Sequence, residues 1–91
     1  MIFDWDEDKN LKNFRKHGVL FDEAKTLWRD LSAIDYLDDI YLVSEERYIR
    51  VGLSIKLRLL AVVFCENDQV VRIISCRKAT HAEEKMYEKR I

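Results

Sequence analysis

The feature that most constrains the fold is the stretch 57–79, LRLLAVVFCENDQVVRIISCRKA. Two apolar runs rich in Val, Ile and Leu are separated by a polar break with Asn67-Asp68 at its tip, a pattern typical of two antiparallel strands joined by a tight turn. The second run also carries Arg72 and, at its end, Arg77. Because an unpaired charge is costly to bury, cations on a strand that supplies the core are a first indication of a functional surface.

The length of 91 residues predicts one domain (1–91) built around one core. Sixteen Lys and Arg against seventeen Asp and Glu give a net charge of −1, so overall charge predicts neither nucleic-acid nor membrane binding. The longest apolar run, 59–65, is too short to cross a bilayer, and the N-terminus does not read as a signal peptide. We therefore expect a cytoplasmic protein with no membrane partner.

The two cysteines, Cys65 and Cys76, are expected to be free thiols. In a hairpin with its tip at Asn67-Asp68 they lie about 20 Å apart at roughly 3.3 Å per residue, which is beyond the reach of a disulfide. Two cysteines and two histidines scattered singly give no metal-ligand spacing, and two glycines give no glycine-rich phosphate loop. We expect neither a metal nor another cofactor.

A first helix is expected to end at His17. Asp6 or Asp8 suits its N-cap, and the following glycine suits its end. Leu11 and Phe14 share its apolar side, which we expect to face the core. Helical spacing also predicts one polar stripe, made of Lys9, Asn13, Lys16 and His17.

Two further helices are expected. Residues 21–28 place apolar side chains at i, i+3, i+6 and i+7, which suits a short amphipathic helix. Thr80 and Glu83 fit a capping box that begins a C-terminal helix over 81–89. Two segments stay open between alternatives: 3–6, an edge strand or a docked tail, and 32–39, a first strand or an acidic loop.

Strand alternation predicts which side chains share a face of the sheet. Residues 46–53 alternate cleanly, and tight turns at Ile55-Lys56 and Asn67-Asp68 would join this strand to the next two. Carried across these turns, the alternation gives an apolar face that can accept helices: Ile49, Val51, Leu53, Leu60, Val62, Phe64, Val71 and Ile73. The opposite face collects Glu46, Tyr48, Arg50, Ala61, Val63, Arg72 and Ile74.

The second face has two interpretations. One is a site for a phosphodiester backbone: Arg50 and Arg72 could bind phosphate through bidentate hydrogen bonds, Tyr48 could stack, and Glu46 could take a proton. The other is a solvated face on which Glu46 and Arg50 form a weak ion pair.

Cations near the strand ends leave further alternatives open. The predicted register places Arg58 opposite Arg77, and because like charges repel, either a bulge separates them or they share a phosphate. Arg77 and Lys78 precede the C-terminal helix, whose free N–H groups could add to an anion site. His17 could be a structural cation at a helix end or a general acid or base.

Taken in order along the chain, these residues resemble the BrnT family of bacterial toxins. The resemblance extends over almost the whole chain, and its most specific blocks are Lys-His-Gly-Val at 16–19 and Ile-Ser-x-Arg-Lys-Ala at 74–79. Other matching residues are Trp5, Asp6, Lys9, Asn13, Phe21, Ala24, Glu46, Arg47, Gly52, Arg72, Ile73 and Glu83.

The resemblance implies an α+β, RelE-like fold, with N-terminal helices on one face of an antiparallel sheet of three to four strands and a C-terminal helix. It also implies a ribonuclease that arrests translation. A BrnA-like ribbon-helix-helix antitoxin would neutralise it, usually in a heterotetramer, and operator DNA would be bound only through that antitoxin. A non-catalytic, antitoxin-binding subunit of a repressor and a plain RNA-binding protein are the alternatives.

For the ribonuclease, the resemblance implies cleavage without a metal, by attack of a ribose 2′-hydroxyl on the adjacent phosphate. We assign the catalytic residues accordingly: Arg72 and Arg77 stabilise the developing charge, and Glu46 or His17 handles the hydroxyl proton. The residues assigned to RNA binding are Lys9, Arg50, Tyr48 and Lys78.

Overall fold

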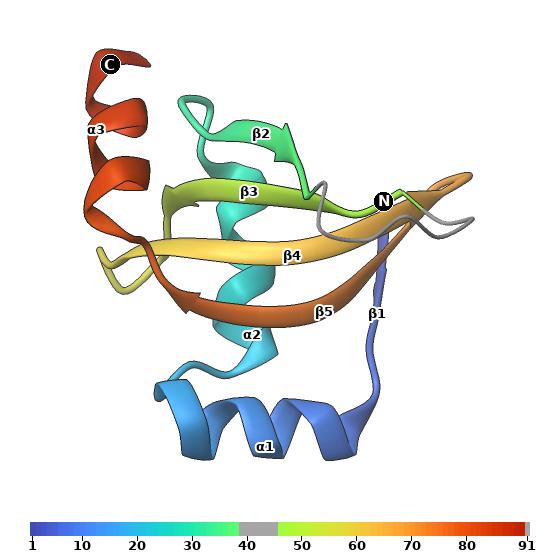
Figure 1. Ribbon diagram of the computed structural model, residues 1–91. Helices are drawn as coiled ribbons and strands as arrows, with labels where there is room; N and C mark the ends of the chain where they lie inside the picture. The colour runs from blue at the N-terminus through green and yellow to red at the C-terminus, as the bar shows by residue number, and fades with distance from the viewer. Residues whose placement is uncertain (39–45, 91) are drawn as a thin grey trace.

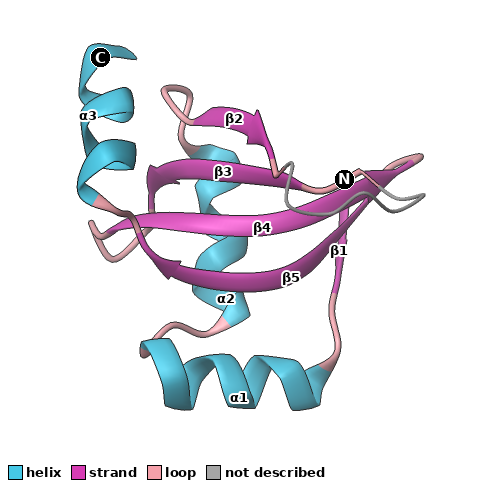
Figure 2. Ribbon diagram, viewed as in Figure 1, coloured by secondary structure: helices cyan, strands magenta, loops and turns pink. Residues whose placement is uncertain are grey.

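The computed structural model describes residues 1–38 and 46–90, which form an α+β fold around a sheet with strand order β1-β5-β4-β3-β2 (Figures 1 and 2). In chain order the elements are β1 (Ile2–Asp4), α1 (Glu7–His17), α2 (Phe21–Ala24), the 3₁₀ helix η1 (Lys25–Arg29), β2 (Ile34–Leu37), β3 (Tyr48–Leu53), β4 (Leu59–Asn67), β5 (Val70–Lys78) and α3 (His81–Arg90).

The expected fold class is confirmed, but the sheet is larger than expected. It has five strands where three to four were expected, because both segments that the sequence left open form edge strands. β2 pairs antiparallel with β3, whereas β1 pairs parallel with β5. Within the described residues, no helix is long and apolar enough to cross a membrane.

The predicted helix ends are found where the capping residues stand. The Asp6 carboxylate accepts hydrogen bonds from the N–H groups of Asp8 and Lys9, so Asp6 is the N-cap of α1, and Gly18 ends the helix at a φ of 72°. The capping box of α3 is also present. The Thr80 N–H donates to the Glu83 carboxylate (2.8 Å) and the Glu83 N–H donates to the Thr80 hydroxyl (3.2 Å).

The orientation predicted for α1 is wrong. Asn10 and Asn13 are buried, with 3% and 7% of their surface exposed, whereas Leu11 and Phe14 are 46% and 49% exposed. The amide groups of the two asparagines bind backbone groups of Phe21, Val19 and Cys76. Hydrogen bonds therefore attach α1 to the rest of the protein in place of the apolar contact that the periodicity predicted.

The predicted register between β3 and β4 is wrong by one residue. Leu53 pairs with Leu59, whereas a tight turn at Ile55-Lys56 places it opposite Arg58. Because side chains alternate with a period of two, this difference turns the whole of β3 over relative to β4. Leu57, at a φ of 61°, accommodates the longer loop.

The hairpin of β4 and β5 keeps its predicted faces although its turn lies one residue later. Val70 pairs with Asn67, two residues after the partner that the predicted turn gives it. Because side chains alternate with a period of two, a shift of two residues leaves each side chain on its predicted face. A bulge at Val63/Phe64 then places Arg77 opposite Ala61. The prediction that Arg77 faces Arg58 is therefore wrong: the later turn moves the pairing by two residues and the bulge by one more.

Apolar side chains cover both faces of the sheet. On one face, α2, η1 and the loop before them close a core with β4 and β5; on the other, Tyr87 of α3 packs on Ile49, Val51 and Ala61. Both cysteines are buried and neither forms a disulfide, as expected. The first core consists of Val19, Phe21, Ala24, Leu27, Leu60, Val62, Phe64, Val71, Ile73 and Cys76.

Candidate functional site: a basic groove between α1 and β5

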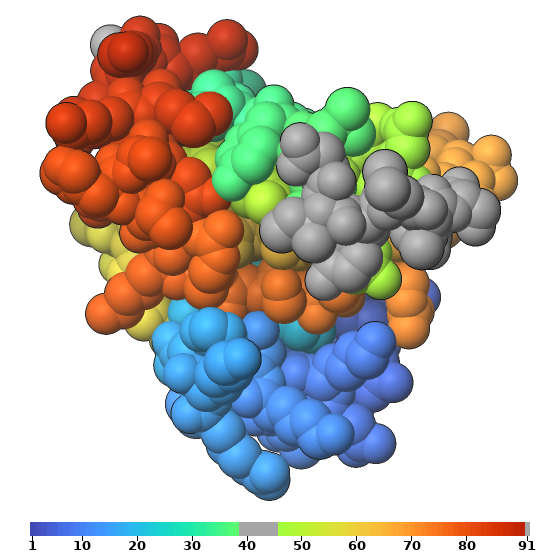
Figure 3. Space-filling model, viewed as in Figure 1, coloured from blue at the N-terminus to red at the C-terminus, as the bar shows by residue number. Residues whose placement is uncertain are grey.

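Cations of α1 line a groove against β5. The groove encloses about 220 Å³, and we call it the α1–β5 groove; its lining residues are Lys9, Lys12, Asn13, Lys16, His17, Ile74 and Ser75. In the space-filling view, α1 (blue) lies directly below the orange surface of β5 (Figure 3). The polar stripe predicted from helical spacing thus lies along one site, but Asn13 serves there as an anchor.

The groove exists because β1 is short. β1 pairs with β5 only as far as Arg72, and α1 follows the strand beyond that point. There the Asn13 side chain takes the place of a neighbouring strand: its amide donates to the Cys76 carbonyl (2.8 Å) and its oxygen accepts from the Cys76 N–H (3.0 Å). Ile74 and Ser75 lie at the bulge of β5, a distortion that often re-aims side chains at functional sites.

Arg72 and Arg77 lie on β5 on either side of this bulge, and each is ion-paired. Arg72 donates to Asp4 at 2.5 Å, and both side chains are about half exposed (46% and 54%). Arg77 donates two hydrogen bonds to Glu83, at 2.6 and 3.0 Å. The charges of the two arginines are therefore partly neutralised, and neither arginine is a lining residue of the groove.

Glu83 holds Arg77 in a buried network. Its carboxylate also accepts hydrogen bonds from the Tyr36 hydroxyl and the Thr80 N–H. Burial alone would raise the pKa of Glu83, but the hydrogen bonds from Arg77, Thr80 and Tyr36 outweigh it and lower the pKa to about 2. Burial and the adjacent carboxylate raise the pKa of Tyr36 to about 12. Glu83 is therefore ionised at neutral pH, and Arg77 is fixed in place.

The prediction that Arg50 and Tyr48 share a face with Arg72 is wrong, because β3 is turned over. Arg50 forms a bidentate ion pair with Asp35 (2.7 and 2.9 Å), and its guanidinium lies 4.1 Å from the ring centre of Trp28. Arg72 points to the other face of the sheet. Their roles in RNA binding stay predictions, without a geometric link to the groove.

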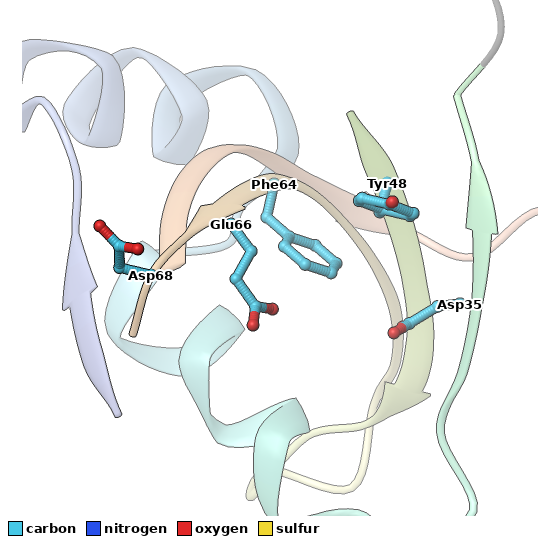
Figure 4. A pocket seen from close by; sticks show the side chains of 5 residues that line it. All are labelled: Asp35, Tyr48, Phe64, Glu66 and Asp68. Atoms are coloured by element: carbon cyan, nitrogen blue, oxygen red, sulfur yellow. The ribbon is translucent and has the colours of Figure 1, made fainter. Parts of the chain in front are cut away.

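Tyr48 lines a second, acidic pocket of about 350 Å³ (Figure 4). Its hydroxyl donates to Glu46 at 2.7 Å, and this hydrogen bond is the main cause that raises the pKa of Tyr48. Carboxylates in a pocket do not favour a phosphate, and the roles assigned to Glu46 and Tyr48 stay predictions. The pocket is lined by Asp35, Tyr48, Phe64, Glu66 and Asp68.

Sequence reasoning missed two kinds of groove residue. Lys12 could have been found, because it lies three residues after Lys9 and four before Lys16 on the same helix. Ile74 and Ser75 could not, because the bulge that presents them has no local sequence pattern. Lys78, assigned to RNA binding, is exposed at the end of β5 and is not a lining residue of the groove.

No metal site is apparent in the part of the chain that the structure describes, since residues 1–38 and 46–90 contain no group of three His, Cys, Asp or Glu side chains able to hold an ion.

The sequence and the fold are matched by a class of small toxins. A family model described as "Ribonuclease toxin, BrnT, of type II toxin-antitoxin system" matches residues 5–83. The chain therefore belongs to the BrnT family of ribonuclease toxins, which confirms the resemblance seen in the sequence. Membership in a type II system implies an antitoxin as partner.

A solved structure agrees with this assignment. The 1.1 Å crystal structure of the Brucella abortus ribonuclease toxin, BrnT, is similar to this chain with a TM-score of 0.66 and 26% sequence identity. The match covers 89% of this chain and 100% of that chain. No curated protein matches the sequence.

Proposed function

We propose that residues 1–91 form one toxin domain, an endoribonuclease that cleaves RNA in the α1–β5 groove without a metal ion. The observation that carries this proposal is the alignment of Lys9, Lys12 and Lys16 with His17 along one groove. Lysines bind the phosphates of a nucleic acid without regard to sequence, and an imidazole can transfer protons near neutral pH. The family description supports the reaction class.

In the proposed reaction the ribose 2′-hydroxyl attacks the adjacent phosphate. A bond forms between the 2′-oxygen and phosphorus, and the bond to the 5′-oxygen breaks, which leaves a cyclic phosphate and a 5′-hydroxyl. Of the two candidate bases, His17 lines the groove and Glu46 does not, so we assign the 2′-hydroxyl proton to His17. A proton from solvent or from the imidazolium completes the leaving group.

Arg72 and Arg77 are proposed to stabilise the negative charge of the transition state. A guanidinium has five N–H donors, so the single hydrogen bond from Arg72 to Asp4 leaves donors for a phosphate. Arg77 is more fully engaged by Glu83, which favours a fixed orientation over free movement. Lys78, exposed beyond Arg77, would extend the phosphate path along β5.

The proposal extends to the partner and the cellular role. A BrnA-like ribbon-helix-helix antitoxin would bind the toxin in a cytoplasmic heterotetramer and bring the pair to operator DNA. RNA cleavage by free toxin would arrest translation. What supports this step is the family's place in a type II system.

A second candidate function is a non-catalytic subunit that only holds the antitoxin. The observation that favours it is the ion pairing of every arginine assigned to RNA. Arg50 is paired with Asp35, Arg72 with Asp4 and Arg77 with Glu83, so part of their charge is already neutralised.

Expression of the chain alone separates the two candidates. We expect growth arrest and mRNA degradation, and cleavage of a single-stranded RNA by the purified protein in excess EDTA. The triple variant Lys9→Gln/Lys12→Gln/Lys16→Gln should cleave at least roughly 100-fold more slowly at moderate salt, as expected when three phosphate contacts are lost. Each lost contact should also reduce the slope of log binding constant against log salt concentration by about 0.7 to 0.9.

A matched control has the same change of charge elsewhere. Lys56→Gln/Lys85→Gln/Lys89→Gln alters three exposed lysines outside the groove and should cleave RNA like the wild type. Equal loss in both triple variants would mean that overall charge, and not the groove, binds RNA. A wild-type chain that cleaves no RNA with or without added divalent metal would favour the non-catalytic subunit.

A further inference from the structure

α1 presents apolar side chains to solvent and polar ones to the core. Leu11 and Phe14, three residues apart on one side of the helix, are 46% and 49% exposed, while Asn10 and Asn13 are buried. Neither Leu11 nor Phe14 lines the α1–β5 groove. A helix that folds in this orientation leaves an apolar strip available for a second helix.

Beyond the first turn of α1 the charges beside this strip are of one sign, whereas Glu7 and Asp8 lie beside Leu11 at its N-terminal end. Lys12 and Arg15 follow Leu11 and Phe14 directly in the sequence, and both are exposed. The acidic residues of α1 are confined to its first turn, where the Glu7 carboxylate accepts hydrogen bonds from Trp5 and Asn10. At the C-terminal end of the strip, beside Lys12 and Arg15, charge complementarity therefore favours an acidic partner, and a type II system supplies a protein partner, the antitoxin.

We propose that the antitoxin docks an acidic amphipathic helix on the α1 outer face, defined as Leu11, Phe14 and Arg15. Apolar side chains of that helix cover Leu11 and Phe14, and its carboxylates pair with Arg15 and Lys12. The consequence for RNA rests on the proposed function of the groove. Lys12, next to Leu11 in the sequence, lines the groove, so carboxylates that pair with it compete with RNA phosphates. Neutralisation would then combine occlusion with charge competition.

The test uses the full chain and the product of the reading frame adjacent to its gene. Leu11→Gln/Phe14→Gln removes the apolar contact without changing charge and should weaken binding at least about 30-fold, as expected for central interface side chains. Arg15→Gln should weaken binding by roughly 3- to 10-fold, with the loss shrinking at high salt. RNA cleavage by both variants, measured without antitoxin, should equal that of the wild type.

The matched control alters another exposed apolar pair. Ile55 and Leu57, in the loop between β3 and β4, are 62% and 78% exposed. Ile55→Gln/Leu57→Gln should leave antitoxin affinity within about twofold of the wild type, since exposed apolar residues by themselves are common.

Four outcomes would overturn the docking proposal. The first two concern affinity: wild-type antitoxin affinity in the Leu11/Phe14 variant, or loss of affinity only in the Ile55/Leu57 variant. The third is loss of RNA cleavage by the Leu11/Phe14 variant in the absence of antitoxin. The fourth is self-association of the wild-type chain that the Leu11/Phe14 variant abolishes while antitoxin binding persists. Failure of the proposed RNA cleavage in the groove gives a different result from failure of the docking surface. If the wild type cleaves no RNA but the binding difference persists, the docking surface stands and the proposed function fails.

Discussion

Asn13→Ala should lower the free energy of unfolding by about 3 kcal/mol, because it leaves three buried backbone groups without hydrogen-bond partners. The Asn13 amide donates to the carbonyls of Val19 (2.9 Å) and Cys76 (2.8 Å), and its oxygen accepts from the Cys76 N–H (3.0 Å). These bonds connect α1 to the edge of β5. Since Leu11 and Phe14 point outward, apolar packing on this side of α1 cannot compensate for their loss.

Urea denaturation followed by circular dichroism measures this effect. Leu11→Ala is the control, because its side chain is nearly half exposed and its loss should cost less than about 1 kcal/mol. If Asn13→Ala lowers the free energy of unfolding no more than Leu11→Ala does, the hydrogen bonds of Asn13 do not anchor α1. The Asn13→Ala variant also tests the groove. With α1 less firmly attached to β5, the lysines of α1 lose their fixed position along the groove, and RNA affinity should fall even where most molecules are folded.

Local signals in the sequence predicted the helix ends correctly. A cap is decided within a few residues, so Gly18 and the pair Thr80 and Glu83 could be identified from spacing alone, and the N-cap of α1 could be narrowed to Asp6 or Asp8. Helical spacing likewise brought Lys9, Lys16 and His17 to one side of α1, and the structure keeps them in one groove. Within a helix, residues three or four positions apart always lie on the same side.

Strand faces could not be predicted with the same success, because one residue in a loop decides them. The turn after β3 is held by Ser54, whose hydroxyl donates to Glu23 and accepts from the backbone N–H groups of Lys56 and Arg58. Glu23 is distant in sequence and belongs to α2, so no local pattern reveals this loop. Its extra residue turned Arg50 away from Arg72 and removed the predicted cluster of arginines.

Long-range hydrogen bonds account for the other errors. Periodicity predicted that Leu11 and Phe14 face the core, yet the edge of β5 at its bulge offers backbone groups that an asparagine can satisfy and a leucine cannot. The ion pair between Arg72 and Asp4 also joins residues that lie 68 positions apart in the sequence. Such pairings depend on the finished fold, so the partners of the arginines could not be read from the sequence.

Glu83→Gln should lower the free energy of unfolding by about 3 kcal/mol at neutral pH, since removing one member of a buried ion pair leaves the other charge without compensation. Glu83 is 4% exposed and accepts hydrogen bonds from Arg77, Tyr36 and the Thr80 N–H. An amide keeps one acceptor but adds donors that face the Arg77 guanidinium. The control, Glu84→Gln, alters a partly exposed carboxylate 3.6 Å from His81 and should cost less than about 0.5 kcal/mol.

The cost of Glu83→Gln should also depend on pH in a defined direction. The pKa of Glu83 is lowered in the fold from 4.5 to about 2, so its carboxylate stabilises the protein fully above the unfolded-state pKa, and this contribution is lost as the pH falls toward 2. Denaturation curves at several pH values should therefore show a constant difference between wild type and variant above about pH 5 that shrinks progressively below it. A difference that stays unchanged down to pH 2 would mean that shape and not charge makes Glu83 necessary, and Arg77 would then owe its position to packing.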